Sequence, residues 1–198
     1  MSNKYIGEIV NNKGKIYIYS ERNCMAILDP VLANDYLYIA CQNDILRIKS
    51  ADLLTTGIIT AKSILYSDEP VNGTSDILSL LQLNSVTSMV YGKDFSNSLF
   101  LTVGDSIYKI CNNTISKCYE DRKIPDIRVK LLHFGAIVLY GRAPQIYLIY
   151  SDGFPISGYP YDEDTMPSGL TYTDVIYSYI GILVLDNNKV WHVMYPKR

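Results

Sequence analysis

One short pattern recurs along this chain and constrains its fold more than any other feature. An apolar run is followed by a tight polar turn and then by a second run that opens with a β-branched residue and usually carries an aromatic one. These second runs lie at residues 16–19, 45–48, 107–110, 146–149 and 190–193. A single hairpin cannot bury its apolar face alone, so a chain that repeats hairpins must stack them against one another. The sequence therefore predicts an all-β fold made of repeated antiparallel hairpins.

Turn residues between the paired runs support this interpretation. Asn and Gly at positions 11–14, Gly104 with Asp105, and the polar stretch 186–189 all suit the backbone of hairpin turns. We expect hairpins over residues 7–19, 35–48, 99–111 and 175–195, and a longer unit of three runs over 128–150.

Three segments depart from the pattern. Residues 75–83 follow a possible N-cap at Thr74, Ser75 or Asp76 and predict the single short helix of the chain. The spacing in 50–66 fits neither a helix nor a strand cleanly, but its β-branched residues favour a strand. The charged stretch 117–126 predicts an exposed connection.

The spacing of the units bears on the architecture. The starts of successive units lie 29, 62, 39 and 44 residues apart, and the step of 62 leaves room for one more unit around residues 86–91. Spacings near 40 residues with three or four short strands each are typical of β-propeller blades. Repeated hairpins also occur in β-sandwiches, where such irregular spacing is common. We therefore expect a small β-propeller-like fold, with a β-sandwich as the alternative.

Two stretches resemble known propeller repeats. Residues 145–160, with Asp152-Gly153 and then Gly158-Tyr159-Pro160, are similar to a blade of quinoprotein-type propellers. Residues 184–191 resemble the strand-turn-strand of the regulator-of-chromosome-condensation type. Most of the glycines that punctuate those repeats are missing here, and no Gly-His or Trp-Asp signature occurs. The resemblance therefore implies a blade-like fold, and it transfers no ligand or cofactor to any position.

Length and charge limit the classes of function. A chain of 198 residues suits one domain, and we expect a single all-β domain over 1–198. The net charge of −2 comes without a basic stripe, so we expect no nucleic-acid partner. No apolar run approaches the length of about 18 residues that suggests a membrane span. The first ten residues lack a secretory signal pattern, which predicts an intracellular location, in the host cytoplasm or in a virion.

The amino-acid usage also suggests a habitat. The chain contains 18 tyrosines, which suit β structure, and few glutamines, which suit a hot environment. This composition resembles that of proteins from hyperthermophilic archaea or their viruses.

The four cysteines show no zinc-ligand spacing. The leading interpretation is four buried free thiols, at Cys24, Cys41, Cys111 and Cys118. A disulfide between Cys111 and Cys118 across the turn at 112–114 is the alternative, and it is favoured if the source is a hyperthermophile.

No residue qualifies as catalytic, cofactor-binding or metal-binding. The two histidines, His133 and His192, lie in predicted strands without a nucleophile motif, and nucleotide-binding and zinc-protease motifs are absent from the sequence. The acidic cluster in the loop after residue 158 lacks the full pattern of a calcium loop. Its aromatic and acidic side chains are the best candidates for an interaction surface: Tyr159, Tyr161, Asp162, Glu163 and Asp164.

We therefore expect a non-enzymatic protein-interaction or scaffold module that needs no cofactor and binds another protein, either a second copy or a different one. A structural component of a virion or other assembly, such as that of an archaeal virus, is one alternative. A small ligand- or sugar-binding propeller is the other.

Overall fold

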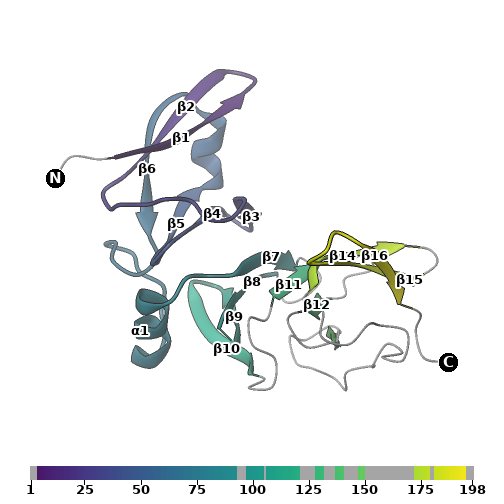
Figure 1. The fold of residues 1–198 in the computed structure, drawn as a ribbon. Coiled ribbons are helices and arrows are strands. Elements are labelled where there is room, and N and C mark those ends of the chain that lie inside the picture. The colour runs from purple at the N-terminus through teal and green to yellow at the C-terminus, as the bar shows by residue number, and fades with distance from the viewer. Residues whose placement is uncertain are drawn as a thin grey trace. The chain divides into compact units, whose positions relative to one another are not determined.

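The computed structural model describes residues 4–92, 97–104, 106–120, 128–131, 137–140, 147–149, 172–178 and 181–194 (Figure 1). The chain divides into two compact units. Unit 1 comprises Met1–Val86 and Ile110–Ser116, and unit 2 comprises Thr87–Lys109 and Lys117–Arg198. The expectation of one domain over 1–198 remains a prediction.

Unit 1 is built on a six-stranded sheet that curls around its own apolar face (Figure 1). Its strands run in the order β1-β2-β6-β5-β4-β3. In sequence they are β1 (Lys4–Asn11), β2 (Gly14–Ser20), β3 (Val31–Ala33), β4 (Tyr36–Cys41), β5 (Asp44–Lys49) and β6 (Gly57–Ser63). The predicted hairpins over 7–19 and 35–48 are both confirmed, because β1 pairs antiparallel with β2 and β4 pairs antiparallel with β5.

The turn between β1 and β2 shows why Asn and Gly are needed there. The Oδ1 atom of Asn11 accepts hydrogen bonds from the backbone amides of Lys13, at 2.8 Å, and Gly14, at 3.1 Å. Gly14 has a φ of 141°, which side chains with a Cβ rarely adopt. The local side-chain hydrogen bonds and the glycine together hold the chain in the reversal.

Segment 50–66 begins differently from its predicted strand. Ser50–Leu54 form the 3-10 helix η1, and the strand β6 starts only at Gly57. β6 then pairs parallel with β2, from Ile16 opposite Gly57 to Ser20 opposite Ala61, and antiparallel with the middle of β5. β6 therefore joins the two hairpins into a single sheet, with β2 on one side and β5 on the other.

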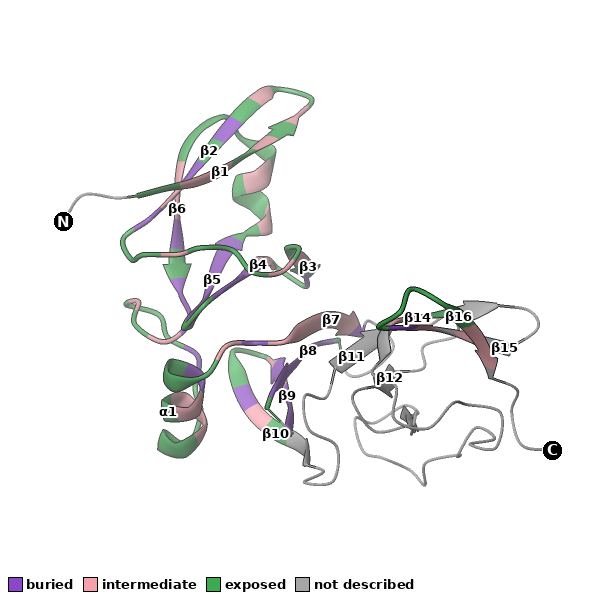
Figure 2. Cartoon of the chain, viewed as in Figure 1, coloured by how far each residue is buried: buried purple, intermediate pink, exposed green. Residues whose placement is uncertain are grey.

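The core of unit 1 lies on the inner face of this sheet. Figure 2 shows β5 almost entirely buried, and five of its six residues are buried. The core consists of hydrophobic residues from β2, β4, β5 and β6: Ile16, Ile18, Ile39, Cys41, Leu46, Ile48 and Ala61. Alternation along β2 places Ile16 and Ile18 in this core while Lys15 and Tyr17 face outward.

A buried arginine ties β5 to distant parts of unit 1. Arg47 is only 5% exposed, and its guanidinium donates to Asn113 Oδ1 at 2.6 Å and to the backbone carbonyl of Glu69. The guanidinium also lies 4.5 Å from the centre of the Tyr36 ring. Asn113 in turn donates to the carbonyl of Pro70, so one side chain connects a strand, a loop and a turn.

The predicted helix at 75–83 is confirmed as α1 (Ser75–Leu83). The residue before it, Thr74, has extended backbone but makes no side-chain cap hydrogen bond. Asp76 in the first turn suits the positive end of the helix dipole, and at the other end Asn84 Nδ2 donates to the Leu80 carbonyl. Leu81 is the buried residue that anchors the helix.

The next sheet contains β7 (Ser88–Gly92), β8 (Ser98–Val103), β9 (Ser106–Cys111) and β10 (Thr114–Glu120), in the order β10-β9-β8-β7. The prediction of an exposed connection at 117–126 is wrong for its first part, because β10 continues to Glu120. The cause lies in the preceding turn. Asn112 and Asn113 both have positive φ values, 47° and 58°, as in the tight turns that best match the twist of a hairpin. Such a turn directs the charged segment back along β9.

Two three-stranded antiparallel sheets complete the described structure. One contains β11 (Arg128–Leu131), β12 (Ile137–Tyr140) and β13 (Tyr147–Ile149), as expected for 128–150. The other contains β14 (Tyr172–Ser178), β15 (Gly181–Asp186) and β16 (Trp191–Met194), which confirms the hairpin at 175–195. The chain is therefore an all-β protein of repeated antiparallel hairpins. No helix in the described segments is long and apolar enough to cross a membrane.

Candidate functional site

The loop that the sequence predicts as an interaction surface is not among the residues that the structure describes. Tyr159, Tyr161, Asp162, Glu163 and Asp164 lie outside the described residues, as does His133. His192 is described, and its Nε2 donates to Asp186 Oδ2 at 2.8 Å. This contact, with the amides of Val190 and Asn188, lowers the pKa of Asp186. Asp186 thus closes the β15–β16 turn, and His192 has a structural partner within the same hairpin.

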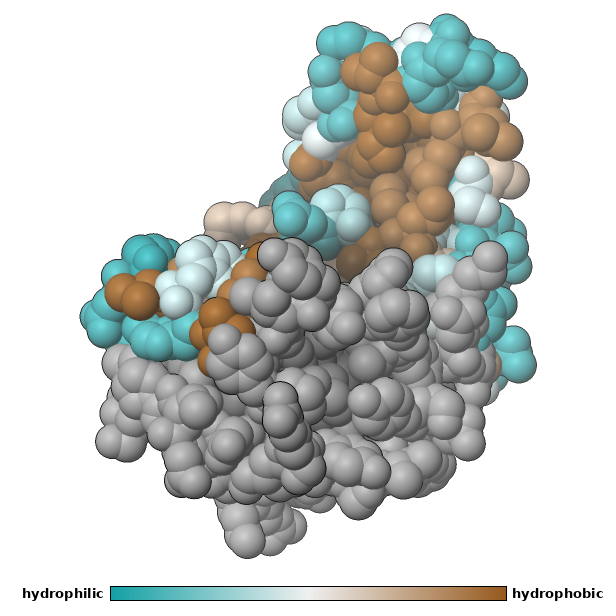
Figure 3. Space-filling view, turned by 90° about the vertical axis from the view of Figure 1, so that its right-hand side faces the viewer, coloured by the Kyte–Doolittle hydropathy of each residue, from teal (hydrophilic) through white to brown (hydrophobic). Residues whose placement is uncertain are grey.

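Hydrophobic side chains reach the surface of unit 1 in two ways. Figure 3 shows a broad apolar area on the N-terminal part of the molecule, and several half-buried residues border the core, among them Ile9, Leu37 and Ile59. Other large hydrophobic side chains project from the outer face of the sheet. Those on β1, β2 and β6 form a continuous group because the strands are adjacent.

We call this outer group the tyrosine face and define it as Tyr5, Tyr17, Tyr19 and Ile58. Tyr17 and Ile58 are direct neighbours across β2 and β6, and they are 40% and 72% exposed. Tyr5 lies opposite Tyr19, with ring centres 5.6 Å apart in an edge-to-face arrangement. Aromatic pairs of this geometry add stability beyond their buried area.

Charged pairs border the tyrosine face. Lys15 Nζ lies 2.9 Å from Glu8 on the β1–β2 hairpin, and Lys62 Nζ lies 2.7 Å from Asp68 at the far end of β6. Exposed aromatic and aliphatic residues surrounded by charges are typical of protein-binding surfaces. The tyrosine face therefore has the composition of a protein-binding site.

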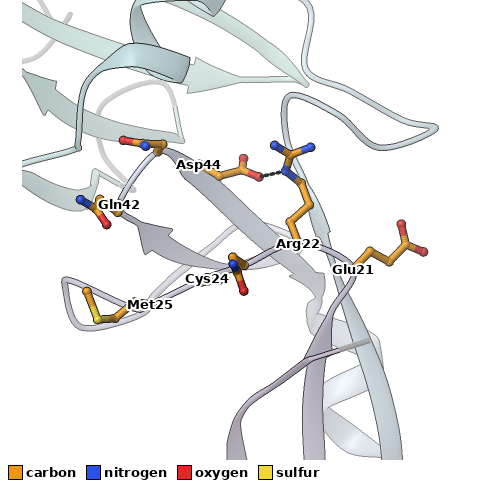
Figure 4. A pocket seen from close by; sticks show the side chains of 8 residues that line it. Glu21, Arg22, Cys24, Met25, Gln42 and Asp44 are labelled. Atoms are coloured by element: carbon orange, nitrogen blue, oxygen red, sulfur yellow. Dashed lines mark ion pairs between the residues drawn. The ribbon is translucent and has the colours of Figure 1, made fainter. Parts of the chain in front are cut away.

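A polar pocket of about 580 Å³ opens elsewhere in unit 1, at the ends of β2 and β4. We call it the Asp44 pocket (Figure 4). It is lined by Glu21, Arg22, Asn23, Cys24, Met25, Gln42, Asn43 and Asp44. The β4–β5 turn and the segment that follows β2 supply these residues.

Asp44 is the most unusual group in this pocket because its side chain is only 6% exposed. Its Oδ1 atom accepts hydrogen bonds from the backbone amide of Ile45 and from the hydroxyl of Ser63, both at 2.8 Å. Its Oδ2 atom has no hydrogen-bond donor in the described part of the chain. The Nε atom of Arg22 lies 3.6 Å away, an ion pair without a hydrogen bond (Figure 4).

Arg22 is held from its other side by an aromatic ring. Its guanidinium lies 3.8 Å from the centre of the Tyr66 ring, within cation–π distance. The guanidinium carbon thus lies close to the ring while Nε faces the carboxylate. Half of the Arg22 side chain remains exposed to solvent.

Burial raises the pKa of Asp44, against the opposing effects of Ser63, the Ile45 amide and Arg22. A raised pKa in the folded state favours folding when the group is protonated, so this contribution is present at low pH and is lost as pH rises through the folded pKa. We therefore expect the stability of the wild type, relative to Asp44→Asn, to increase as pH falls from 7 to 3. Urea unfolding of both proteins across this range measures the difference. A stability difference between the two proteins that does not change with pH would contradict the raised pKa of Asp44.

A disulfide joins the two sides of the Asp44 pocket. Cys24 is bonded to Cys41 at the end of β4, with Cα atoms 5.1 Å apart. The prediction of four free thiols is therefore wrong, because the segment after β2 returns alongside β4, where Ala26 forms a bridge with Cys41 and the Ile27 amide donates to the Ala40 carbonyl. The alternative disulfide between Cys111 and Cys118 is also wrong, because the sulfur of Cys111 forms no disulfide bond.

The sequence indicated little of this site. Gln42 and Asp44 lie inside the expected hairpin over 35–48, whose pattern indicates no function for them, and Arg22 and Tyr66 lie far apart in the chain. The one available signal was the Asp after Gln42-Asn43, where a side chain can accept from the next amide. Within the described segments, no three His, Cys, Asp or Glu side chains form a group that could hold a metal ion.

Comparison with known proteins bears on the fold alone. No protein-family model and no curated protein matches the sequence. Among solved structures, the chain is similar to the extracellular domain of BT4673 from B. thetaiotaomicron, with a TM-score of 0.54 and 10% identity over 98% of this chain. It is also similar to YCF48 from Cyanidioschyzon merolae, with a TM-score of 0.51 and 10% identity over 91% of this chain.

Both neighbours have propeller-type folds. The fold of this chain is therefore β-propeller-like, as the spacing of its hairpins predicted, and the blade type is not shown. The chain spans 21% of the length of the BT4673 domain and 63% of the length of YCF48.

Proposed function

We propose that this chain is a non-enzymatic protein-binding or scaffold module and that the tyrosine face is its binding surface. The observation that carries the proposal is the pair of neighbouring exposed side chains, Tyr17 and Ile58, on a rigid sheet. Side chains of this kind, when a partner buries them, contribute most of the affinity in protein interfaces. Tyrosine does so with little loss of side-chain entropy. The propeller-like fold supports the proposal because it presents such surfaces on a stable framework.

The sheet holds the tyrosine face in a fixed shape. Tyr17 and Ile58 belong to β2 and β6, whose inward-facing residues are fixed in the core by Ile16, Ile18 and Ala61. Binding therefore orders few further side chains, which favours affinity.

The test is an affinity measurement with the protein that co-purifies with this chain from the native host in stoichiometric amount. We expect Ile58→Asp to weaken this complex by about ten-fold or more, because it places a charge in the apolar centre of the interface. Leu83→Asp is the matched control, because Leu83 is 79% exposed and lies on α1, and we expect unchanged affinity. Equal loss in both variants, or none in Ile58→Asp, would contradict the proposal.

A role as a structural component of an assembly is the second candidate. β1 ends the six-stranded sheet among the described strands and carries part of the tyrosine face. Exposed edge strands pair readily with another chain. Sedimentation of the purified chain distinguishes the two functions: fixed oligomers that Ile58→Asp dissociates favour assembly, and a monomer favours a different partner.

We also propose an intracellular location. The Cys24–Cys41 disulfide restricts this proposal to a hyperthermophilic host, since disulfides inside cells persist chiefly in hyperthermophiles. Alkylation of thiols in intact cells tests it: an oxidised pair in a cytoplasmic fraction supports the location, and recovery of the protein only outside the cell contradicts it.

A further inference from the structure

The Asp44 pocket shares no residue with the tyrosine face and has a feature that protein binding does not explain. A buried carboxylate oxygen, Asp44 Oδ2, has no donor among the described residues, although an arginine lies 3.6 Å away. Buried polar atoms are nearly always hydrogen-bonded, and an unpaired one carries a substantial desolvation cost. An acceptor and a cationic donor are therefore left side by side at the wall of a pocket.

We propose that the Asp44 pocket binds a neutral, hydroxyl-rich ligand, namely a saccharide. This site is additional to the proposed protein-binding function. A hydroxyl group is both a donor and an acceptor, so one hydroxyl can donate to Asp44 Oδ2 and accept from the Arg22 guanidinium. The distance of 3.6 Å between Arg22 Nε and Asp44 Oδ2 increases when the half-exposed Arg22 side chain rotates, and the hydroxyl then fits between them.

The charges of the pocket select against ionic ligands. Glu21 and Asp44 bring two negative groups to the pocket, where Arg22 is the positive lining residue and Lys4 adds a second positive group through its hydrogen bond to Asn23. An anion would meet both carboxylates, and a cation would compete with Arg22 for Asp44. A neutral ligand avoids both the repulsion of an anion and the competition of a cation. Its hydroxyls can bind to the donors and the acceptors of the pocket at the same time.

The other lining residues suit the same chemistry. Gln42 and Asn43 each carry an amide that can donate to one hydroxyl and accept from another, and Asn23, whose Oδ1 accepts from Lys4, can donate through Nδ2. The volume of about 580 Å³ lies within the range of small-molecule sites. The pocket is therefore large enough for a sugar unit and polar on most of its wall.

A neighbouring groove extends the site on the far side of Arg22. It includes Tyr66 and Ser67, and the Ser67 hydroxyl is also buried without a hydrogen-bond partner in the described segments. Arg22 lines both cavities. Two unpartnered buried oxygens, one in each cavity, indicate that the site accepts a ligand longer than one ring.

The test is an array of immobilised neutral oligosaccharides, probed with the full chain and followed by calorimetric titration of the oligosaccharide bound most strongly. Arrays of uronic-acid and amino-sugar oligosaccharides provide the charged comparison. We expect binding to neutral sugars. Failure to bind any of them, or a preference for a charged series, would overturn the proposal.

Two variants locate the binding. Asp44→Asn keeps the acceptor used by Ile45 and Ser63 but replaces Oδ2 with a donor, and Arg22→Met removes the donor from a half-exposed position. We expect each to weaken sugar binding by about ten-fold or more. Glu8→Gln, a carboxylate-to-amide change on β1, is the matched control and should bind like the wild type. Wild-type affinity in both Asp44→Asn and Arg22→Met would overturn the assignment to this pocket.

These results are separable from those for the tyrosine face. Ile58→Asp should leave sugar binding unchanged, and Asp44→Asn should leave the protein complex unchanged.

Discussion

Replacing Arg47 with alanine is expected to lower the free energy of unfolding by about 3 kcal/mol. The guanidinium makes two hydrogen bonds, to Asn113 Oδ1 and to the Glu69 carbonyl, and lies against the Tyr36 ring. Hydrogen bonds that involve a charged group are each worth about 1.5–3 kcal/mol, and the alanine variant also leaves a space where the arginine stem packed. Urea unfolding monitored by circular dichroism measures the change.

Two further variants sharpen this prediction. Lys49→Ala changes an exposed cation on the same strand, and we expect an effect within about 0.5 kcal/mol. Arg47→Lys should recover little stability, because a single ammonium group cannot reproduce the planar donors of arginine. A loss below about 1 kcal/mol in Arg47→Ala would show that the buried arginine does not hold β5 to the Glu69 and Asn113 segments.

Removing the Cys24–Cys41 disulfide should have a comparable effect. The bond closes a loop with a sequence separation of 17, for which constraint of the unfolded chain gives about 3 kcal/mol. We expect the double variant Cys24→Ser, Cys41→Ser to lose this amount in urea unfolding. Added dithiothreitol provides the control: it should reduce the stability of the wild type to that of the variant and leave the variant unchanged. A wild type that is insensitive to dithiothreitol would show that the bond is absent.

The sequence predicted best those elements that depend on nearby residues. Helix α1 was expected at 75–83 because an apolar run follows short polar residues, and the structure has these bounds. The β1–β2 turn was predicted because Asn11 and Gly14 act on their immediate neighbours. Such local preferences are visible in the sequence because the partners are a few residues apart.

Features that depend on distant partners were missed. The parallel pairing of β2 with β6 joins segments about 40 residues apart, and no hairpin pattern predicts it. The charges of 117–126 predicted an exposed connection, whereas the Asn112-Asn113 turn extends strand β10 as far as Glu120. In the same way, the Cys24–Cys41 bond depends on how the segment after β2 lies against β4.

The candidate sites follow the same division. The sequence predicted an interaction surface only in the loop that carries Tyr159 and Tyr161. The register of β1, β2 and β6 was needed to bring Tyr5, Tyr17 and Ile58 onto one face. The Asp44 pocket needs two separate segments, which carry Arg22 and Asp44, and a third segment supplies Tyr66 against Arg22. No local pattern connects these residues.

Hydroxyl-radical footprinting of the chain, alone and in complex with its stoichiometric partner, tests the central claim that the tyrosine face is the binding surface. We expect labelling of Tyr5, Tyr17 and Ile58 to fall in the complex, while labelling of Leu83 on α1 stays the same. Unchanged labelling of the three residues, with protection elsewhere on the chain, would contradict the claim.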